Sequence, residues 1–317
     1  MTIHRINIHL ASPRGFCAGV DRAILMVEEA LKKFGSPIYV RHEIVHNKYV
    51  VENLKKKGAI FIDELDEITD FSRPVIFSAH GVPKSVPKNA ENLNLKFFDA
   101  TCPLVSKIHR EVENFERLNL PIILIGHKDH PEVIGTMGQI KSPIYLIEKI
   151  SDLDLLKIPK EKKIAYVTQT TLSVDDTKSI IQAIKKKFYN VIKPRKNDIC
   201  YATTNRQEAV KRIAPKCDIF YVIGAKNSSN SLRLLEVAKQ YGAKKSILLE
   251  NIENYDQKIL KNINNLGITA SASAPEILVQ KFIKILKLKN DILLHEEDSK
   301  KENIVFKIPH QIKSKLK

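Results

Sequence analysis

Three short stretches of this chain place a cysteine in the same local frame, at the entry to a basic and apolar segment with helical spacing. The stretches read GFCAGVDRAI, ATCPLVSKIHREV and DICYATTNRQEAV, and their cysteines are Cys17, Cys102 and Cys200. A polar residue at the end of an apolar, strand-like run follows each cysteine 29, 28 and 28 residues later. These polar strand ends are His46, His130 and Ser228. The constant spacing predicts that one structural unit occurs three times.

A second polar strand end follows in every repeat and strengthens this interpretation. The three residues lie 63, 68 and 73 positions after their cysteines, at His80, Thr170 and Ser273. Three copies of one unit would bring equivalent strand ends to a common centre, so three scattered thiols would form one cluster. The fourth cysteine, Cys217, lies outside the pattern and is predicted to be a small buried residue at the start of a strand.

Apolar, strand-like runs alternate with helical stretches along the whole chain, which is typical of α/β proteins with mostly parallel sheets. The runs include PVIFSAHG, PIILIGH, KIAYVTQT and DIFYVIGAKNSS. Ligands of such sheets bind at the carboxyl ends of the strands, where the polar residues of these runs fall. We expect three α/β lobes, 14–97, 98–195 and 196–283, with the N-terminal strand 1–13 joining the third lobe and a basic tail over 284–317.

Composition narrows the possible partners and the compartment. A net charge of +16 would suit an anionic partner, although the lysine runs at 55–57 and 185–187 are typical of solvated helix faces. Four cysteines without a CxxC pair favour neither a disulfide framework nor a zinc ribbon, and they fit a reducing compartment. The sequence has no basic start followed by an apolar run and no 18 uninterrupted apolar residues. We therefore expect a cytoplasmic chain that is not inserted in a membrane.

Three converging thiolates would attract a soft or borderline metal, chiefly zinc or an iron–sulfur cluster. Structural zinc prefers four protein ligands, and zinc held by three thiolates alone would be a weak Lewis acid. A cubane cluster held by three cysteines instead leaves one iron open to a substrate. The histidines, serines and asparagine at the strand ends are donors that a phosphate or diphosphate requires.

The chain resembles a known family, the 4-hydroxy-3-methylbut-2-enyl diphosphate reductases of the non-mevalonate isoprenoid pathway. The resemblance covers roughly residues 5 to 283 and lies in long, ordered blocks: PRGFCAGVDRAI, VRHEIVHNKYVV, FSAHGV, FDATCPLVSKIH, IGHKDHPEVIGTMGQ, VTQTTLSVDDT, DICYATTNRQEAV, KNSSNSLRL and SASAPEILV. It implies three similar α/β lobes in a pseudo-threefold arrangement around one [4Fe-4S] cluster. It also implies an allylic diphosphate substrate, the products isopentenyl and dimethylallyl diphosphate, and an electron donor of the ferredoxin or flavodoxin type.

The resemblance assigns roles to the matching residues. The implied cluster ligands are Cys17, Cys102 and Cys200. The residues implied around the diphosphate are His46, His80, Ser228, Ser229, Asn230 and Ser273. His130, Glu132 and Thr170 are expected to face the substrate hydroxyl as catalytic residues, and His130 and Thr170 also to bind substrate. Glu132 is the only carboxylate that the motifs place in this pocket, so we expect it to supply the proton for the leaving oxygen, with Thr170 as a relay.

One position departs from the family pattern, which usually reads GASAP where this chain reads SASAP. Ser271 therefore replaces a glycine. If the position needs a positive φ, the serine is strained by about 1 kcal/mol. Alternatively, its hydroxyl adds a donor near the phosphate.

Other histidines and two other functions have to be weighed against this interpretation. We expect His127 to support polar structure, His42 to be structural, and His109 and the tail histidines to be solvated. A nucleic-acid binder would use the basic tail, but no binding motif accompanies the charge, so we expect no nucleic acid as partner. A zinc hydrolase is the other alternative, and it would be colourless where an iron–sulfur protein is brown.

Overall fold

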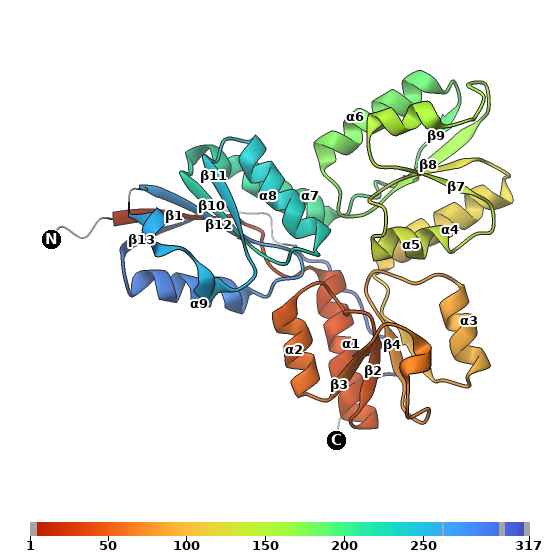
Figure 1. Ribbon diagram of the computed structural model, residues 1–317, viewed down its shortest axis with the longest axis horizontal. Coiled ribbons are helices and arrows are strands. Elements are labelled where there is room, and N and C mark those ends of the chain that lie inside the picture. Colours follow the sequence, from red (N-terminus) through yellow and green to blue (C-terminus); the bar gives the residue numbers. More distant parts are fainter. Residues whose placement is uncertain (1–4, 262, 298–301, 314–317) are drawn as a thin grey trace. The chain divides into compact units, whose positions relative to one another are not determined.

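The structure is a computed structural model that describes residues 5–261, 263–297 and 302–313. The described chain contains three separate sheets whose paired strands all run parallel (Figure 1). It divides into two compact units: unit 1 comprises Met1–Ala18, His46–Val50 and Tyr201–Ile304, and unit 2 comprises Gly19–Val45, Val51–Cys200 and Val305–Lys317. Each unit is described by itself.

Unit 1 contains the five-stranded sheet, in the order β11-β10-β12-β1-β13. Its strands are β1 (Arg5–Leu10), β10 (Ile219–Ile223), β11 (Lys245–Leu249), β12 (Asn265–Ala270) and β13 (Asp291–Glu296). The helices α7 (Tyr201–Ile213) and α8 (Ser229–Gln240) cover one face, and α9 (Glu276–Lys287) covers the other (Figure 1). Successive β10 side chains alternate between the two cores, as the period of a strand buried on both faces requires: Phe220 and Val222 pack toward α7 and α8, whereas Tyr221 packs toward α9.

Unit 2 contains two four-stranded sheets, β3-β2-β4-β5 and β7-β6-β8-β9. The strands of the first are β2 (Ile38–Arg41), β3 (Ala59–Ile62), β4 (Val75–Phe77) and β5 (Phe97–Asp99), and its lobe has the helices α1 (Ala18–Phe34), α2 (Lys48–Lys56) and α3 (Ser85–Asn92). The second has β6 (Ile122–Ile125), β7 (Ile144–Ile147), β8 (Ile164–Thr168) and β9 (Val191–Ile192), with α4 (Pro103–Arg117), α5 (Pro131–Met137) and α6 (Val174–Lys187). In the second lobe, α4 and α6 pack on opposite faces of the sheet.

Short 3-10 helices complete the described elements. They are η1 (Leu65–Glu67), η2 (Ile150–Leu155), η3 (Ala214–Lys216), η4 (Ile252–Asn254) and η5 (Gln257–Leu260).

The expectation of three α/β lobes with parallel sheets is confirmed, and the three sheets share one strand order. The shared order is β3-β2-β4-β5 in the first lobe, β7-β6-β8-β9 in the second and β11-β10-β12-β1 in the third. The second strand of each repeat along the chain thus lies at an edge, and the first lies beside it. The fourth position is held by β5, β9 and β1, and β1 pairs with β12 in the sheet of residues 219–270. The expected domain boundaries remain a prediction. Within the segment 284–317, β13 pairs with β1 along its whole length, so part of the expected tail is an edge strand.

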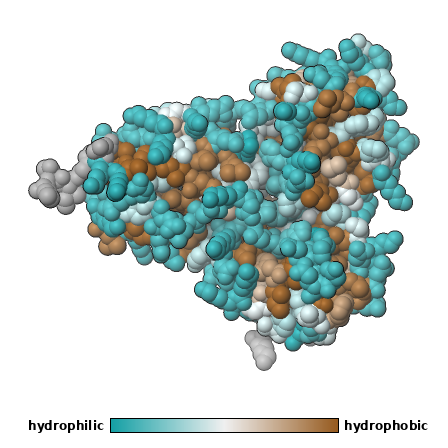
Figure 2. Space-filling view, in the orientation of Figure 1, coloured by the Kyte–Doolittle hydropathy of each residue, from teal (hydrophilic) through white to brown (hydrophobic). Residues whose placement is uncertain are grey.

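The surface agrees with the view that much of the positive charge is solvated. Hydrophilic side chains cover most of the face shown in Figure 2, with hydrophobic side chains in separate areas. The lysines at 55–57 are exposed at the end of α2, as are Lys185 and Lys186 at the end of α6. Among the helices of the described ranges, none combines the length and apolar character needed to cross a bilayer.

Candidate functional site

The three predicted cysteines occupy equivalent positions in the three repeats. Each is the residue immediately before a long helix: Cys17 precedes α1, Cys102 precedes α4 and Cys200 precedes α7. None of the three is in a disulfide, and all three are partly exposed. Because the N-terminus of a helix carries unsatisfied N–H groups and a partial positive charge, an anionic group bound at this position would be stabilised.

Each cysteine is also tied to the loop that carries the second polar strand end of a repeat. The Cys17 amide donates to Ala272 O at 3.4 Å, the residue before Ser273. The Cys102 amide donates to Ala79 O at 3.0 Å, the residue before His80. The Cys200 amide donates to the carbonyl of Thr170 itself at 3.1 Å. The sequence repeat is therefore also a repeat of backbone hydrogen bonding, which ties each cysteine to the loop that carries a predicted polar site residue.

Cys217 differs from these three in its burial and in its position in the fold. It is 3% exposed, its thiol donates to Ile213 O at 3.2 Å, and burial raises its pKa to about 12. The expectation of a small buried residue is confirmed.

In unit 1 the predicted residues form a cluster of hydroxyl, amide and imidazole groups. Ser273 Oγ donates to the carbonyl of His46 at 3.0 Å, and Asn227 Nδ2 lies 3.3 Å from His46 Nδ1. Asn230 Oδ1 accepts from Ala272 N at 2.9 Å, whereas Asn230 Nδ2 is buried and has no hydrogen-bond partner within the described part of the chain. A buried amide donor without a partner costs free energy until an acceptor reaches it.

The serines of this cluster lie around the start of α8. Ser228 caps the helix, since its Oγ accepts from Ser231 N at 3.3 Å, and Ser229 is the first helical residue. Both are nearly buried. The amides of the first helical turn and these hydroxyls make the start of α8 a place for an anion.

Ser271, the departure from the family pattern, carries no backbone strain of the kind considered. Among the described residues that are not glycine, a positive φ occurs at His42, Asn94, Asn119 and Asp129, and Ser271 is not one of them. Its hydroxyl lies 3.2 Å from Ser273 Oγ. The second expectation, an added hydroxyl beside the predicted phosphate residues, fits this geometry.

In unit 2 the predicted residues form a cluster centred on a buried carboxyl. Glu132 is 3% exposed and accepts two hydrogen bonds from Thr170, one from the amide to Oε1 at 2.7 Å and one from the hydroxyl to Oε2 at 2.8 Å. Burial raises the pKa of Glu132 to about 7, although the two bonds from Thr170 act in the opposite direction. The carboxyl can therefore exchange a proton near neutral pH.

His130 lies beside this carboxyl, and His80 of the same unit contacts His130. His130 caps α5, because its Nδ1 accepts from Glu132 N at 3.1 Å, and this bond requires that Nδ1 carry no proton. The rings of His80 and His130 meet edge to face with centroids 6.0 Å apart. The turn that joins β6 to α5 thus orders His130 and Glu132 together.

Sequence reasoning missed several polar groups near these residues. Asp198, two residues before Cys200, is buried, and burial raises its pKa to about 6 against the effect of Lys107. His109 was expected on the solvated surface, and this is wrong: a Cβ on Gly81 would lie 2.7 Å from its ring, and burial lowers the pKa of His109 to about 4. An isolated histidine on a polar helix gives no signal of a neighbouring glycine in another lobe.

His42 and His127 have supporting positions. His42 adopts a φ of 59°, and burial lowers its pKa. The His127 amide donates to Gln169 Oε1 at 3.0 Å, which ties the β6 and β8 strand ends together.

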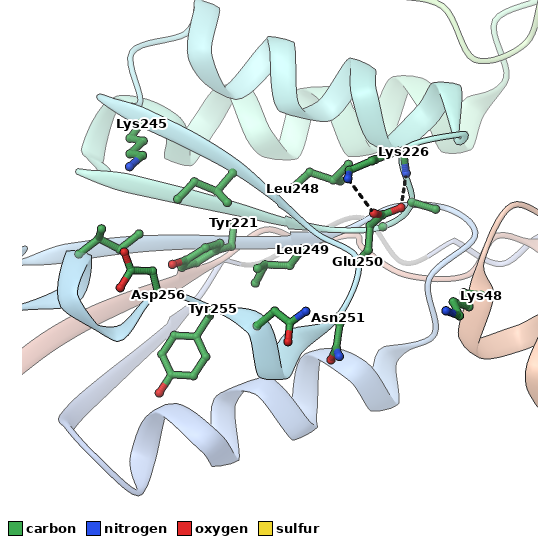
Figure 3. A pocket seen from close by; sticks show the side chains of 15 residues that line it. Lys48, Tyr221, Lys226, Lys245, Leu248, Leu249, Glu250, Asn251, Tyr255 and Asp256 are labelled. Carbon is green, nitrogen blue, oxygen red and sulfur yellow. Dashed lines mark hydrogen bonds and ion pairs between the residues drawn. The ribbon is translucent and has the colours of Figure 1, made fainter.

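A separate pocket of about 640 Å³ lies in unit 1, on the side of the sheet that α9 covers (Figure 3). Tyr221, Tyr255 and Asp256 lie near one end of it and the ion pair of Lys226 with Glu250 at the other. These residues are outside the predicted set, and the pocket combines apolar walls with charges of both signs.

The donor set fits an iron–sulfur cluster better than a complete protein site for zinc. Three equivalent cysteines outside any disulfide lie at helix N-termini, and the fourth thiol is buried and donates to Ile213 O. Within either unit, the described residues contain no group of three or more His, Cys, Asp and Glu side chains placed to hold a metal ion. Cys17 belongs to unit 1 and Cys102 and Cys200 to unit 2, so a site shared by all three stays a prediction.

Comparison with known proteins gives one consistent result for this three-lobed α/β chain. Residues 8–287 match the family model described as LytB protein. The chain is 52% identical over 314 residues to the 4-hydroxy-3-methylbut-2-enyl diphosphate reductase of Roseobacter denitrificans, covering 99% of both chains. It is 51% identical over 310 residues to the enzyme of the same name from Methylocella silvestris, covering 98% of this chain and 97% of that one.

A solved structure agrees with these relatives. The E-1-hydroxy-2-methyl-but-2-enyl-4-diphosphate reductase from Plasmodium falciparum superposes with a TM-score of 0.91 at 41% identity, covering 98% of this chain and 97% of that one. The chain belongs to the LytB protein family. It is therefore an oxidoreductase, as its curated relatives are.

Proposed function

We propose that this chain reduces 4-hydroxy-3-methylbut-2-enyl diphosphate to isopentenyl and dimethylallyl diphosphate, using one [4Fe-4S] cluster held by Cys17, Cys102 and Cys200. The reaction consumes two electrons and two protons and releases the allylic hydroxyl as water. The observation that carries the proposal is the threefold equivalence of these cysteines: each lies immediately before a helix, and its amide is hydrogen-bonded to the loop of a polar strand end. The cluster would supply the electrons.

The unit 1 residues bind the diphosphate in this proposal. The buried amide of Asn230 has a donor that needs an acceptor, and a phosphate oxygen would satisfy it. Ser228, Ser229 and Ser273 add hydroxyl donors at the start of α8 and beside His46. His46 in the same unit adds an imidazole donor, and His80 of unit 2 is proposed to add a second one. These contacts orient the allylic alcohol for reaction.

The unit 2 residues deliver the proton. A carboxyl with a pKa of about 7 is protonated in roughly half of the molecules at neutral pH. When Glu132 Oε2 carries the proton, the 2.8 Å hydrogen bond reverses, so that Oε2 donates to Thr170 Oγ1 and the threonine passes its own proton to the leaving oxygen. His130, held by its bond from Glu132 N, completes the polar wall that faces the hydroxyl.

We also propose the setting in which the enzyme works. Electrons arrive from a ferredoxin- or flavodoxin-type protein, since a cluster accepts one electron at a time. Four cysteines outside any disulfide fit a reducing compartment, and we place the chain in the cytoplasm.

The test is anaerobic reconstitution of the full chain with iron and sulfide, followed by an assay with the allylic diphosphate and a chemical reductant. We expect a brown protein that forms both products. A reconstituted protein that binds the diphosphate but forms neither product would contradict the proposed reaction. A colourless protein that retains zinc and hydrolyses esters would favour the zinc hydrolase instead.

A further inference from the structure

A basic side chain follows each of the three cysteines by five or six residues on the helix that the cysteine precedes. These are Arg22 on α1, Lys107 on α4 and Arg206 on α7. None of the roles assigned above uses them. Each of these side chains contacts the loop that precedes a different cysteine. The helix after Cys17 contacts the loop of Cys102, the helix after Cys102 that of Cys200, and the helix after Cys200 that of Cys17.

Arg206 contacts the loop in front of Cys17. Its guanidinium donates to Gly15 O from Nε at 3.0 Å and from Nη2 at 2.7 Å, and Nη2 also donates to Phe16 O at 3.0 Å. These are the carbonyls two residues and one residue before Cys17. Gly15 has a φ of +74°, so glycine is favoured at this turn.

Arg22 makes the equivalent contact in front of Cys102. Its Nη1 donates to Ala100 O at 3.2 Å and to Thr101 O at 3.1 Å, again two residues and one residue before the cysteine. The two arginines thus perform the same task in unit 2 and in unit 1.

Lys107 contacts the loop in front of Cys200. Its Nζ donates to Lys196 O at 2.5 Å and to Asp198 Oδ1 at 2.7 Å, and it lies 3.3 Å from Glu111 Oε2. Because a lysine lacks the planar, two-pronged guanidinium of arginine, it binds this loop through one carbonyl and one carboxylate oxygen.

The C-terminal segment completes the coordination of both arginines. In unit 1, Glu302 accepts from Arg206 Nη1 at 3.1 and 3.2 Å, with side-chain exposures of 1% for the arginine and 14% for the glutamate. In unit 2, Lys307 O accepts from Arg22 Nε at 3.1 Å. A guanidinium buried this deeply requires an opposite charge, because burial of an unpaired charge is strongly unfavourable.

We propose that Arg22, Lys107 and Arg206 are positioning residues that each hold the loop of one cysteine, and that the C-terminal residues Glu302 and Lys307 anchor the two arginines. The inference rests on the proposed function only in taking the three thiols as cluster ligands. Fixed ligand loops lower the cost of ordering the thiols when a cluster binds.

Hydrogen exchange of the full, cofactor-free chain tests this proposal, read at the Gly15 and Cys17 amides and at the Cys102 amide. In Arg206→Lys we expect the Gly15 and Cys17 amides to exchange about tenfold faster and the Cys102 amide to stay unchanged, because only the loop held by Arg206 loosens. In Arg22→Lys the pattern should reverse. Glu302→Gln should repeat the Arg206→Lys pattern with a smaller change, and it serves if Arg206→Lys fails to fold.

The matched control is Glu208→Gln, which removes the ion pair of Glu208 with Lys211 on the same helix, α7, and touches no cysteine loop. Exchange within twofold of the parent at Gly15 and Cys17 in both Arg206→Lys and Glu302→Gln would overturn the proposal. Equal acceleration at all the cysteine loops would also overturn it, because that is general destabilisation.

A second readout is the rate at which a chelator removes iron from the reconstituted variants, which should rise in Arg206→Lys and not in Glu208→Gln. If the exchange pattern appears but the parent binds no iron, the proposed function fails and the positioning role stands.

Discussion

The site residues of unit 1 and unit 2 differ in chemistry although their strands and loops are equivalent. The unit 1 group is built of hydroxyls and amides around the start of α8 together with the His46 imidazole, and Asn230 Nδ2 lacks an acceptor among the described residues. The unit 2 group is built of two imidazoles and the buried Glu132 carboxyl. One repeated scaffold thus carries different residue types at equivalent strand ends, and in our proposal it serves anion binding in one unit and proton transfer in the other.

The largest expected effect is that of removing the proposed proton donor of unit 2. Glu132→Gln keeps the shape and removes the acid, so turnover should fall by about 10²- to 10⁴-fold while substrate affinity changes little. Steady-state kinetics and calorimetry with the same cluster-loaded variant separate the two quantities. Turnover within about threefold of the parent at saturating substrate would mean that the proton comes from another group.

The pH dependence of stability sharpens the same point. Burial raises the pKa of Glu132 to about 7, so the folded state favours the neutral carboxyl. The stability that this preference provides is complete below the ordinary carboxyl pKa near 4.5 and is lost as the pH rises through 7. The side chain that Glu132→Gln introduces does not titrate. The free energy of unfolding of this variant, relative to that of the parent, should therefore increase by about 3 kcal/mol between pH 4.5 and pH 8.

Urea unfolding of the cofactor-free chains at several pH values measures this gain. A constant difference between variant and parent across the range would show that the pKa of Glu132 is not raised.

The next effect concerns the binding side. Ser229→Ala removes a nearly buried hydroxyl at the first position of α8, and loss of one hydrogen bond to a charged phosphate should cost about 1.5 to 3 kcal/mol of affinity. Turnover at saturating substrate should stay close to that of the parent. A variant that keeps full affinity for the diphosphate products by calorimetry would remove Ser229 from the phosphate contacts.

His80→Ala tests whether the division follows the units or the residue types. His80 lies in unit 2 with the proton-transfer group, but we assign it to the diphosphate. It should therefore resemble Ser229→Ala, with weakened binding of about the same size. A loss confined to turnover would move His80 to the proton-transfer group.

The smallest expected effect is that of Cys217→Ser. Its thiol is buried and bonded to Ile213 O, away from any helix N-terminus among the described elements. Iron content should match that of the parent, and only a modest decrease in stability is expected. Loss of the cluster in this variant would mean that the ligand set is wrong.

The sequence predicted the repeat because a unit of strand, loop and helix produces a recurring order and spacing of residues along the chain. The regular cysteine spacing and the polar strand ends are consequences of this repeated unit. In the structure, each of the three cysteines holds the equivalent position immediately before a helix. The contacts of Arg206 and Glu302 could not be predicted, because they join residues 96 positions apart and no periodicity links them. The burial of His109 likewise depends on packing against Gly81, which spacing along α4 does not indicate.

The iron and acid-labile sulfide content of the anaerobically reconstituted chain tests the central claim most directly, because the account requires one cluster held jointly by three cysteines. We predict about four irons and four sulfides per chain for the parent and for Cys217→Ser, and loss of the stable cubane in each of Cys17→Ser, Cys102→Ser and Cys200→Ser. Full iron content in any one of these three variants, or a parent that binds no cluster, would contradict the account.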